Sequence, residues 1–159
     1  MRPMSQFVVL HNIRSAHNVG SIFRTADGAG IVKLFLCGYT PTPVDRFGRP
    51  NEEIAKTSLG ATESVPWEYC AETKLCLERL RREGVAIVAV EQHARALPYT
   101  EAVYGGDVAY IFGNEIEGVP NDICEEADSV VHIPMHGMKE SLNVSVSAGI
   151  ILFEARKKQ

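Results

Sequence analysis

The sequence lacks the features that would anchor a chain in a membrane or cross-link it covalently. No apolar run approaches the roughly 18 residues that a membrane-spanning helix needs. The apolar run at residues 7–10 is shorter than the roughly 7 to 15 residues of a signal-peptide core. The four cysteines form no Cys-x-x-Cys pair, so we predict reduced thiols in a reducing compartment. These absences predict a cytoplasmic protein without a membrane segment.

Familiar catalytic and nucleotide-binding motifs are also missing. The sequence has no P-loop lysine, no Rossmann glycine triplet and no Gly-x-Ser-x-Gly nucleophile elbow. His132 and His136 have the spacing of a helical zinc pair, but Pro134 between them disfavours a helix. We therefore predict no metal site.

Charge is distributed unevenly along the chain. The net charge of −4 disfavours a generic nucleic-acid binder, for which a basic domain is expected. Residues 1–50 nevertheless carry a net charge of +4, and residues 51–159 carry −8. The basic residues of the first part either form one positive face or are scattered, solvated charges. They are Arg2, Arg14, Arg24, Lys33, Arg46 and Arg49.

The alternation of apolar runs predicts a single α/β domain over residues 1–159. With 45% hydrophobic residues, the chain is able to bury a core without cross-links. Strands are predicted at residues 7–10, 33–37, 85–90, 107–112 and 129–133, and helices at 18–29, 51–58, 72–83, 121–127 and 141–157. This order predicts a Rossmann-like, mostly parallel sheet with helices on both faces.

Three polar, glycine-containing segments lie at the ends of predicted strands. Residues 12–30 follow the first strand, residues 112–120 follow the fourth, and residues 133–150 follow the fifth. Ligands of open α/β sheets gather at the carboxyl ends of the strands. We therefore expect the three segments to converge on one site.

In the first segment, a predicted helix places Arg24 between Gly20 and Gly28 on one face. A helix face with glycines on both sides of one arginine leaves room for a large partner. Arg24 is then expected to bind a phosphate or to orient a hydroxyl group. The alternative is a surface ion pair between Arg24 and Asp27, with the glycines serving helix packing.

In the second segment, the bare backbone of Gly113 suits a ribose or an adenosine. Glu115 either accepts a hydrogen bond from a ligand, fixes Arg24, or stabilises the helix that begins near Pro120. In the third segment, Ser141 is predicted to be the N-cap of the last helix.

The three segments together resemble the motifs of a known family. They read Asn12-Ile-Arg-Ser-Ala-His-Asn-Val-Gly-Ser-Ile-Phe-Arg-Thr-Ala-Asp-Gly-Ala-Gly, Ile111-Phe-Gly-Asn-Glu-Ile-Glu-Gly-Val-Pro and, after Ile133-Pro-Met, Ser141-Leu-Asn-Val-Ser-Val-Ser-Ala-Gly. In order and separation they resemble the three signatures of SpoU/TrmH-type RNA 2′-O-methyltransferases. The resemblance implies the SPOUT fold, in which the C-terminal part is threaded into a deep trefoil knot that holds S-adenosylmethionine.

The resemblance also implies roles for individual residues. The cofactor-binding positions are Gly113, Ile133, Met135, Gly137 and Leu142. The catalytic and substrate-orienting positions are Asn18, Arg24, Glu115, Ser141 and Asn143. Because a free arginine stays protonated at neutral pH, we expect Arg24 to orient the substrate and stabilise charge rather than to remove a proton.

Members of this family are usually homodimers, so the resemblance implies a dimer joined through residues 18–30 and the C-terminal helix. It also implies an RNA substrate, and the 2′-hydroxyl distinguishes RNA from DNA. The small size and the lack of a separate RNA-binding domain favour tRNA over ribosomal RNA. The alternatives are a non-catalytic knotted RNA-binding protein and a methyltransferase for a small metabolite that carries a hydroxyl group.

Overall fold

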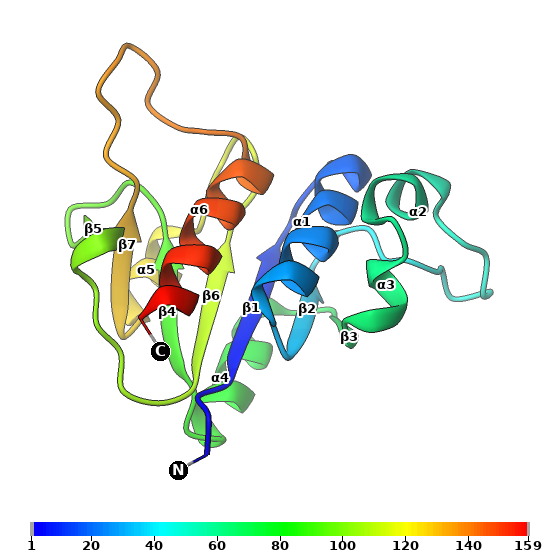
Figure 1. Cartoon of the computed structure of the whole chain (residues 1–159), viewed down its shortest axis with the longest axis horizontal. Coiled ribbons are helices and arrows are strands. Elements are labelled where there is room, and N and C mark those ends of the chain that lie inside the picture. Colours follow the sequence, from blue (N-terminus) through cyan, green and yellow to red (C-terminus); the bar gives the residue numbers. More distant parts are fainter. Residues whose placement is uncertain (1, 159) are drawn as a thin grey trace.

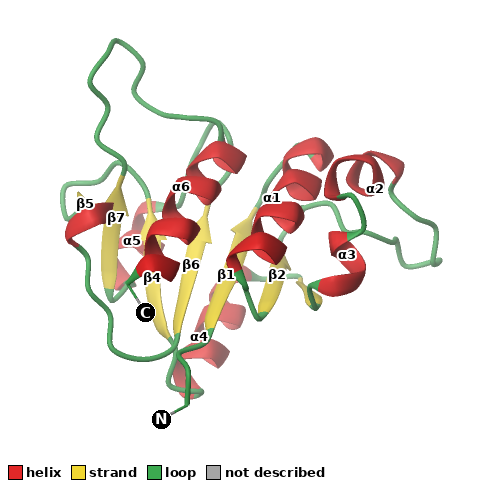
Figure 2. Ribbon diagram, in the orientation of Figure 1, coloured by secondary structure: helices red, strands yellow, loops and turns green. Residues whose placement is uncertain are grey.

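The computed structural model describes residues 2–158. These residues form one central sheet between two layers of helices (Figures 1 and 2). The strands are β1 (Gln6–His11), β2 (Lys33–Cys37), β3 (Trp67–Cys70), β4 (Ala86–Val90), β5 (Leu97–Pro98), β6 (Val108–Phe112) and β7 (Ser129–His132). The helices are α1 (Ala16–Ala29), α2 (Glu52–Ser58), α3 (Ala61–Ser64), α4 (Thr73–Arg82), the 3-10 turn η1 (Tyr99–Glu101), α5 (Asn121–Glu126) and α6 (Val144–Lys157). Within residues 2–158, every helix is too short or too polar to cross a bilayer.

The seven strands form one parallel sheet in the order β3-β2-β1-β6-β4-β7-β5. β1 pairs with β2 on one side and with β6 on the other. The predicted α/β class and the parallel sheet are confirmed. β3 and β5 were not predicted, and both are short strands at the two edges of the sheet.

Alternate residues of the strands enter two separate cores. Val8 and Leu10 of β1 belong to the core that includes α1 and α6, whereas Val9 belongs to the core that includes α4 and α5. Figure 1 shows α1 and α6 in front of the sheet and α4 behind it. Since helices cover both faces, β6 is buried at all five positions and has the continuous apolar run typical of a central parallel strand.

The helix that follows β7 begins later than the sequence predicted. Its N-cap is Asn143, whose Oδ1 accepts a hydrogen bond from the Ser145 N–H at 2.8 Å. The prediction that Ser141 is the cap is wrong. An asparagine side chain caps as well as a serine, and Asn143 has the extended backbone that a cap requires (φ −52°, ψ 140°). Residues 141–143 therefore belong to the preceding loop.

Candidate active site

A cleft of about 430 Å³ opens at the carboxyl edge of the sheet. It lies between the loops that follow β4, β6 and β7 and the start of α6, and its volume is within the range of small-molecule sites. Figure 1 shows the loop between β7 and α6, in orange, rising above this edge. The predicted site residues that line the cleft are Gly113, Glu115, Ile133, Met135, Ser141, Leu142 and Asn143. Residues from the second and third motifs therefore converge as expected, whereas no residue of the first motif lines this cleft.

Gly113 lies where the chain leaves β6 and turns back on itself. A Cβ atom at this position would overlap the backbone of Gly118 and Val119. The turn is closed by the Gly118 N–H, which donates to the Asn114 carbonyl oxygen at 2.8 Å. Space, rather than an unusual φ angle, therefore requires glycine here and leaves main chain without a side chain at the cleft.

Asn114 holds this loop in place, a role that its position in the sequence did not predict. It is only 5% exposed. Its Oδ1 accepts from the N–H groups of Ile116 and Glu117, both at 2.8 Å. Its Nδ2 donates to the Asn12 carbonyl oxygen at 2.9 Å and to the Tyr39 hydroxyl at 2.7 Å. Its position inside the second motif was a signal, but the sequence did not reveal that its partners lie in the segments after β1 and β2.

Glu115 joins the same loop to the start of α1. Its carboxylate accepts from the N–H groups of Arg14 at 2.8 Å and Ser15 at 2.9 Å, and from Asn18 Nδ2 at 3.2 Å. Burial alone would raise the pKa of this carboxyl, but these hydrogen bonds outweigh burial and lower it below its usual value. Glu115 thus stabilises the N-terminus of α1. The expectations that it fixes Arg24 or stabilises α5 are wrong.

Asn18 and Asn143 continue this series of hydrogen bonds. Asn143 Nδ2 donates to Asn18 Oδ1 at 3.3 Å, while the Asn18 amide donates to Glu115. Asn18 is 7% exposed and does not line the cleft, so its amide contacts Glu115 and Asn143 rather than the cleft. Three predicted catalytic residues therefore connect α1, the β6 loop and the start of α6.

Arg24 and Gly137 lie outside the cleft lining. Arg24 is exposed on α1 and forms no hydrogen bond or ion pair with any residue from 2 to 158. The alternative of an ion pair with Asp27 is wrong, because the Asp27 carboxylate instead accepts from Ser64 Oγ at 2.7 Å. The guanidinium of Arg24 is therefore available to a ligand or to another chain.

The glycines on either side of Arg24 serve helix packing. Gly20 is buried, and a Cβ atom there would overlap the Thr57 side chain of α2. A Cβ atom on Gly28 would lie 3.3 Å from the Phe153 ring of α6. The prediction that this helix face is open to a large partner is thus wrong at Gly20, because Gly20 packs against α2 of the same chain.

The cleft carries unsatisfied and acidic groups. His132 Nδ1 is buried and has no hydrogen-bond partner within residues 2–158, and His132 lines the cleft. Buried polar atoms are normally paired, so this nitrogen suits a polar group of a ligand. Glu91, Glu115 and Glu117 also line the cleft and favour a ligand with positive charge.

We expect Glu115→Ala to lower the free energy of unfolding by about 1 kcal/mol near neutral pH, since two N–H groups lose a partly exposed partner. The folded-state pKa is lowered. The contribution is therefore fully present above the unfolded pKa of about 4.3 and is lost as the pH falls through the folded value. Urea unfolding at a series of pH values measures this difference. Glu117→Ala is the control, because its carboxylate accepts no hydrogen bond from residues 2–158. A Glu115→Ala deficit that is independent of pH would contradict the assignment.

Comparison with known proteins gives the chain its family. The model described as "SpoU rRNA Methylase family" matches residues 5–153. A 23S rRNA (guanosine-2′-O-)-methyltransferase of Xanthomonas axonopodis is 32% identical over 152 residues, which are 96% of this chain and 58% of that protein. The tRNA (guanosine(18)-2′-O)-methyltransferase of Aquifex aeolicus is 31% identical over 162 residues, covering 99% of this chain and 72% of that protein.

A solved structure agrees with these relatives. The AdoMet-bound rRNA methyltransferase of Sinorhizobium meliloti has a TM-score of 0.87 and 32% identity, over 96% of this chain and 56% of that one. The chain thus spans little more than half the length of several proteins that it resembles. The family match nonetheless extends over nearly all of the sequence. The chain therefore belongs to the SpoU rRNA Methylase family.

Proposed function

We propose that this protein is an S-adenosylmethionine-dependent methyltransferase that acts on the ribose 2′-hydroxyl of RNA. The observation that carries the proposal is the cleft at the ends of β6 and β7, which residues of two motifs line together. The relatives named above are 2′-O-methyltransferases of RNA, and the solved relative holds AdoMet.

The residues of the cleft fit this cofactor. Ile133, Met135 and Leu142 supply apolar surface for an adenine, and the bare main chain at Gly113 permits close approach. The acidic lining suits a molecule with a sulfonium and an ammonium group. As part of the proposal, the segments after β6 and β7 form a deep trefoil knot around the cofactor. The position of both segments at one cleft supports this arrangement.

The cofactor supplies a methyl group activated by a sulfonium, so the protein must align a ribose hydroxyl in line with the methyl and help its proton to leave. In the proposal, the guanidinium of Arg24 orients the ribose and stabilises the charge that develops on its oxygen, and the proton of the hydroxyl passes to solvent water. The series from Glu115 through Asn18 to Asn143 fixes the loop that carries Ser141.

We also propose a homodimer in which Arg24 of one subunit serves the cleft of the other. Val146, Ile150 and Phe153 follow one another on α6 at helical spacing, and each is at least partly exposed. Gly28 of α1 lies against Phe153 and is one turn from Arg24, so this apolar stripe and the free guanidinium are neighbours. Covering the stripe with a second copy would bring a second Arg24 to the same region.

The loop after β2 offers a surface for RNA. Phe47 is 67% exposed, and the guanidinium groups of Arg46 and Arg49 lie 4.8 Å and 5.0 Å from the centre of its ring. Asp45 holds the loop, accepting from the Phe47 N–H at 2.8 Å and from Arg49 Nε at 2.7 Å. An exposed aromatic ring flanked by arginines stacks well on an unpaired base.

We expect Phe47→Ala to weaken RNA binding about tenfold, because stacking on one base contributes roughly 1 to 3 kcal/mol. Cofactor binding should not change. Filter binding of RNA and calorimetry of the cofactor measure the two affinities. Tyr69→Ala is a matched control, since Tyr69 is also an exposed aromatic residue (52%) but lies on the edge strand β3. Equal RNA binding by the two variants would remove Phe47 from the interface.

Within RNA, we propose tRNA as the substrate. The 31% identity to the tRNA enzyme of Aquifex over 99% of this chain supports this choice, and the Xanthomonas relative named for 23S rRNA represents the alternative. The test is transfer of labelled methyl to tRNA and, separately, to ribosomal RNA, followed by nuclease digestion. We expect label in a 2′-O-methyl nucleoside from tRNA. Faster methylation of ribosomal RNA would reverse the order, and cofactor binding without transfer to RNA would point to the non-catalytic or small-substrate alternatives.

A further inference from the structure

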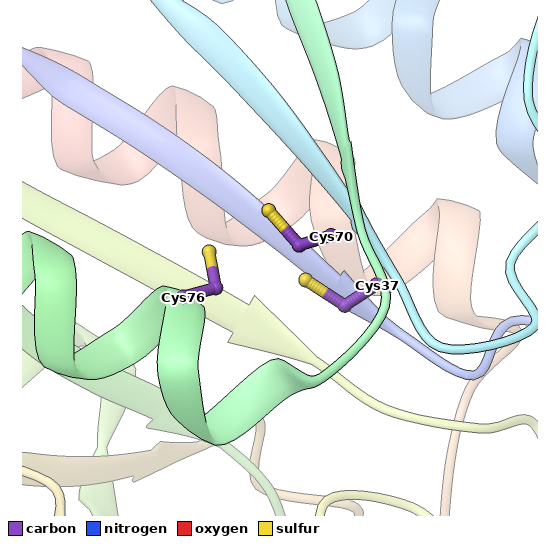
Figure 3. A group of neighbouring side chains, drawn as sticks. All are labelled: Cys37, Cys70 and Cys76. Atoms are coloured by element: carbon purple, nitrogen blue, oxygen red, sulfur yellow. The ribbon is translucent and has the colours of Figure 1, made fainter.

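Three of the four cysteines meet at one point, away from the cleft lining (Figure 3). Cys37 ends β2, Cys70 ends β3 and Cys76 lies in α4. Their Sγ atoms all lie within 4.8 Å of one another. Cys37 and Cys70 are register partners in adjacent strands, so the sheet itself holds two of the three sulfurs side by side. Sequence spacing could not reveal this cluster.

The arrangement differs from ordinary burial of cysteine as a small apolar residue. Cys37 and Cys76 are buried, but Cys70 is only partly buried, so the cluster lies near the protein surface rather than in the middle of the core. Figure 3 shows the three sulfur atoms near one another, each carried by a separate element. Three thiolates form a donor set for thiophilic metal ions.

We propose that Cys37, Cys70 and Cys76 bind one thiophilic divalent metal ion, for which Zn²⁺ is the reference, with water or another exogenous ligand in a fourth position. A zinc–sulfur distance of about 2.3 Å places the sulfurs of a tetrahedral site about 3.8 Å apart. The sulfurs already lie within 4.8 Å, so closure needs a shift of at most about 1 Å, which side-chain rotation supplies.

The charged side chains beside the cluster favour a divalent ion over a monovalent one. Glu68 pairs with Lys33 at 2.9 Å and with Arg79 at 2.5 Å, and Cys70 Sγ donates to the same carboxylate at 3.5 Å. Glu68, Lys33 and Arg79 together carry a net charge of +1. Three thiolates around a divalent ion carry a net negative charge of one, so the two groups balance. A monovalent ion would leave excess negative charge in a partly buried place.

Metal binding at this site releases protons. Burial is the main cause that raises the pKa of the Cys70 thiol to about 12, and a hydrogen bond with Cys37 together with burial raises the pKa of Cys76. Binding as thiolates therefore displaces protons from Cys70 and Cys76, and the affinity for the ion should increase with pH. An ion here would tie the edge strand β3 to β2 and α4.

The test is titration of the full chain, reduced and freed of metal, with Co²⁺, which reports thiolate ligation by its charge-transfer absorption. We expect one Co²⁺ per chain, displacement by Zn²⁺, and a higher midpoint of thermal unfolding with Zn²⁺. Cys70→Ala should lose the absorption and the thermal shift. Because Cys70 is the least buried of the three, this variant is the one least disturbed in its fold, which circular dichroism checks.

Cys124→Ala is the matched control, since Cys124 is buried and does not belong to the cluster. It should keep the absorption. The proposal is overturned if the reduced, folded protein shows no thiolate absorption with Co²⁺, or if Cys70→Ala retains it. Stoichiometric binding of Cu⁺ by a protein that binds neither Co²⁺ nor Zn²⁺ would overturn the assignment of a divalent ion.

Discussion

Replacing Arg24 by alanine should lower the turnover number for methyl transfer about 10²- to 10³-fold, the usual cost of removing one donor that stabilises transition-state charge. Arg24 is exposed and has no partner within residues 2–158, so the change removes no structural contact. The unfolding midpoint and the affinity for the cofactor should stay as they are. Arg24→Lys keeps the charge but loses the planar fork, so it should recover only part of the activity. Nearly full turnover by Arg24→Ala would exclude the proposed role.

Mixed dimers test whether Arg24 acts on the partner's cleft. One parent carries Arg24→Ala, and the other carries Leu142→Asp, which places a charge in the cleft at a partly exposed position. If Arg24 acts across the interface, each mixed dimer contains one site with both groups intact and is active. If Arg24 acts within its own chain, neither site of a mixed dimer is intact, and mixing two inactive parents restores nothing.

Gly113→Ala should abolish cofactor binding and lower the stability of the fold. The added Cβ atom would overlap the backbone of Gly118 and Val119, which cannot move aside as a flexible side chain would. Overpacking of this kind costs about 1 to 3 kcal/mol. Asn114 and Glu115 hold the loop on both sides, so the strain should fall on the main chain that borders the cleft. Calorimetry with S-adenosylmethionine and urea unfolding measure the two effects.

Gly137→Ala is the control for this experiment. Gly137 is also a proposed cofactor-binding residue, but an added Cβ atom there meets no other atom within 4 Å. We therefore expect unchanged stability and a much smaller effect on cofactor binding than at Gly113. If the two variants lost cofactor binding equally while both stayed stable, the loss at Gly113 would not come from the overlap.

The central elements of the fold could be predicted because their signals are local. β6 is an apolar run buried on both faces, and α1 is bounded by a capping serine and by Gly30, which has a φ of 72°. β3 escaped prediction because its four residues are mostly half-exposed, so the strand has neither an apolar run nor a clear alternation. Alternation of strands and helices predicted parallel pairing, but it gave no reason for β6 to lie between β1 and β4.

The candidate site could be predicted only as a set of segments. Gly113, Ile133 and Leu142 converge at one cleft because the carboxyl ends of parallel strands share one edge of the sheet. The partners of Glu115 could not be inferred, since Arg14 and Ser15 are about 100 residues away in the sequence. The position of Arg24 outside the cleft also depends on packing, because Gly20 and Gly28 fix how α1 lies against α2 and α6.

The strand order also determines how the chain must assemble. β4 is synthesised before β6, yet β4 reaches β1 only through β6, which lies between them. Until residues 108–112 are made, β1 can pair with β2 on one side, but its other edge has no partner strand. Such distant pairings slow folding, and an unpaired strand edge invites association with other chains. The free edge of β1 therefore stays open until β6 arrives, and a chain that lacks β6 should be more prone to aggregation than the complete sheet.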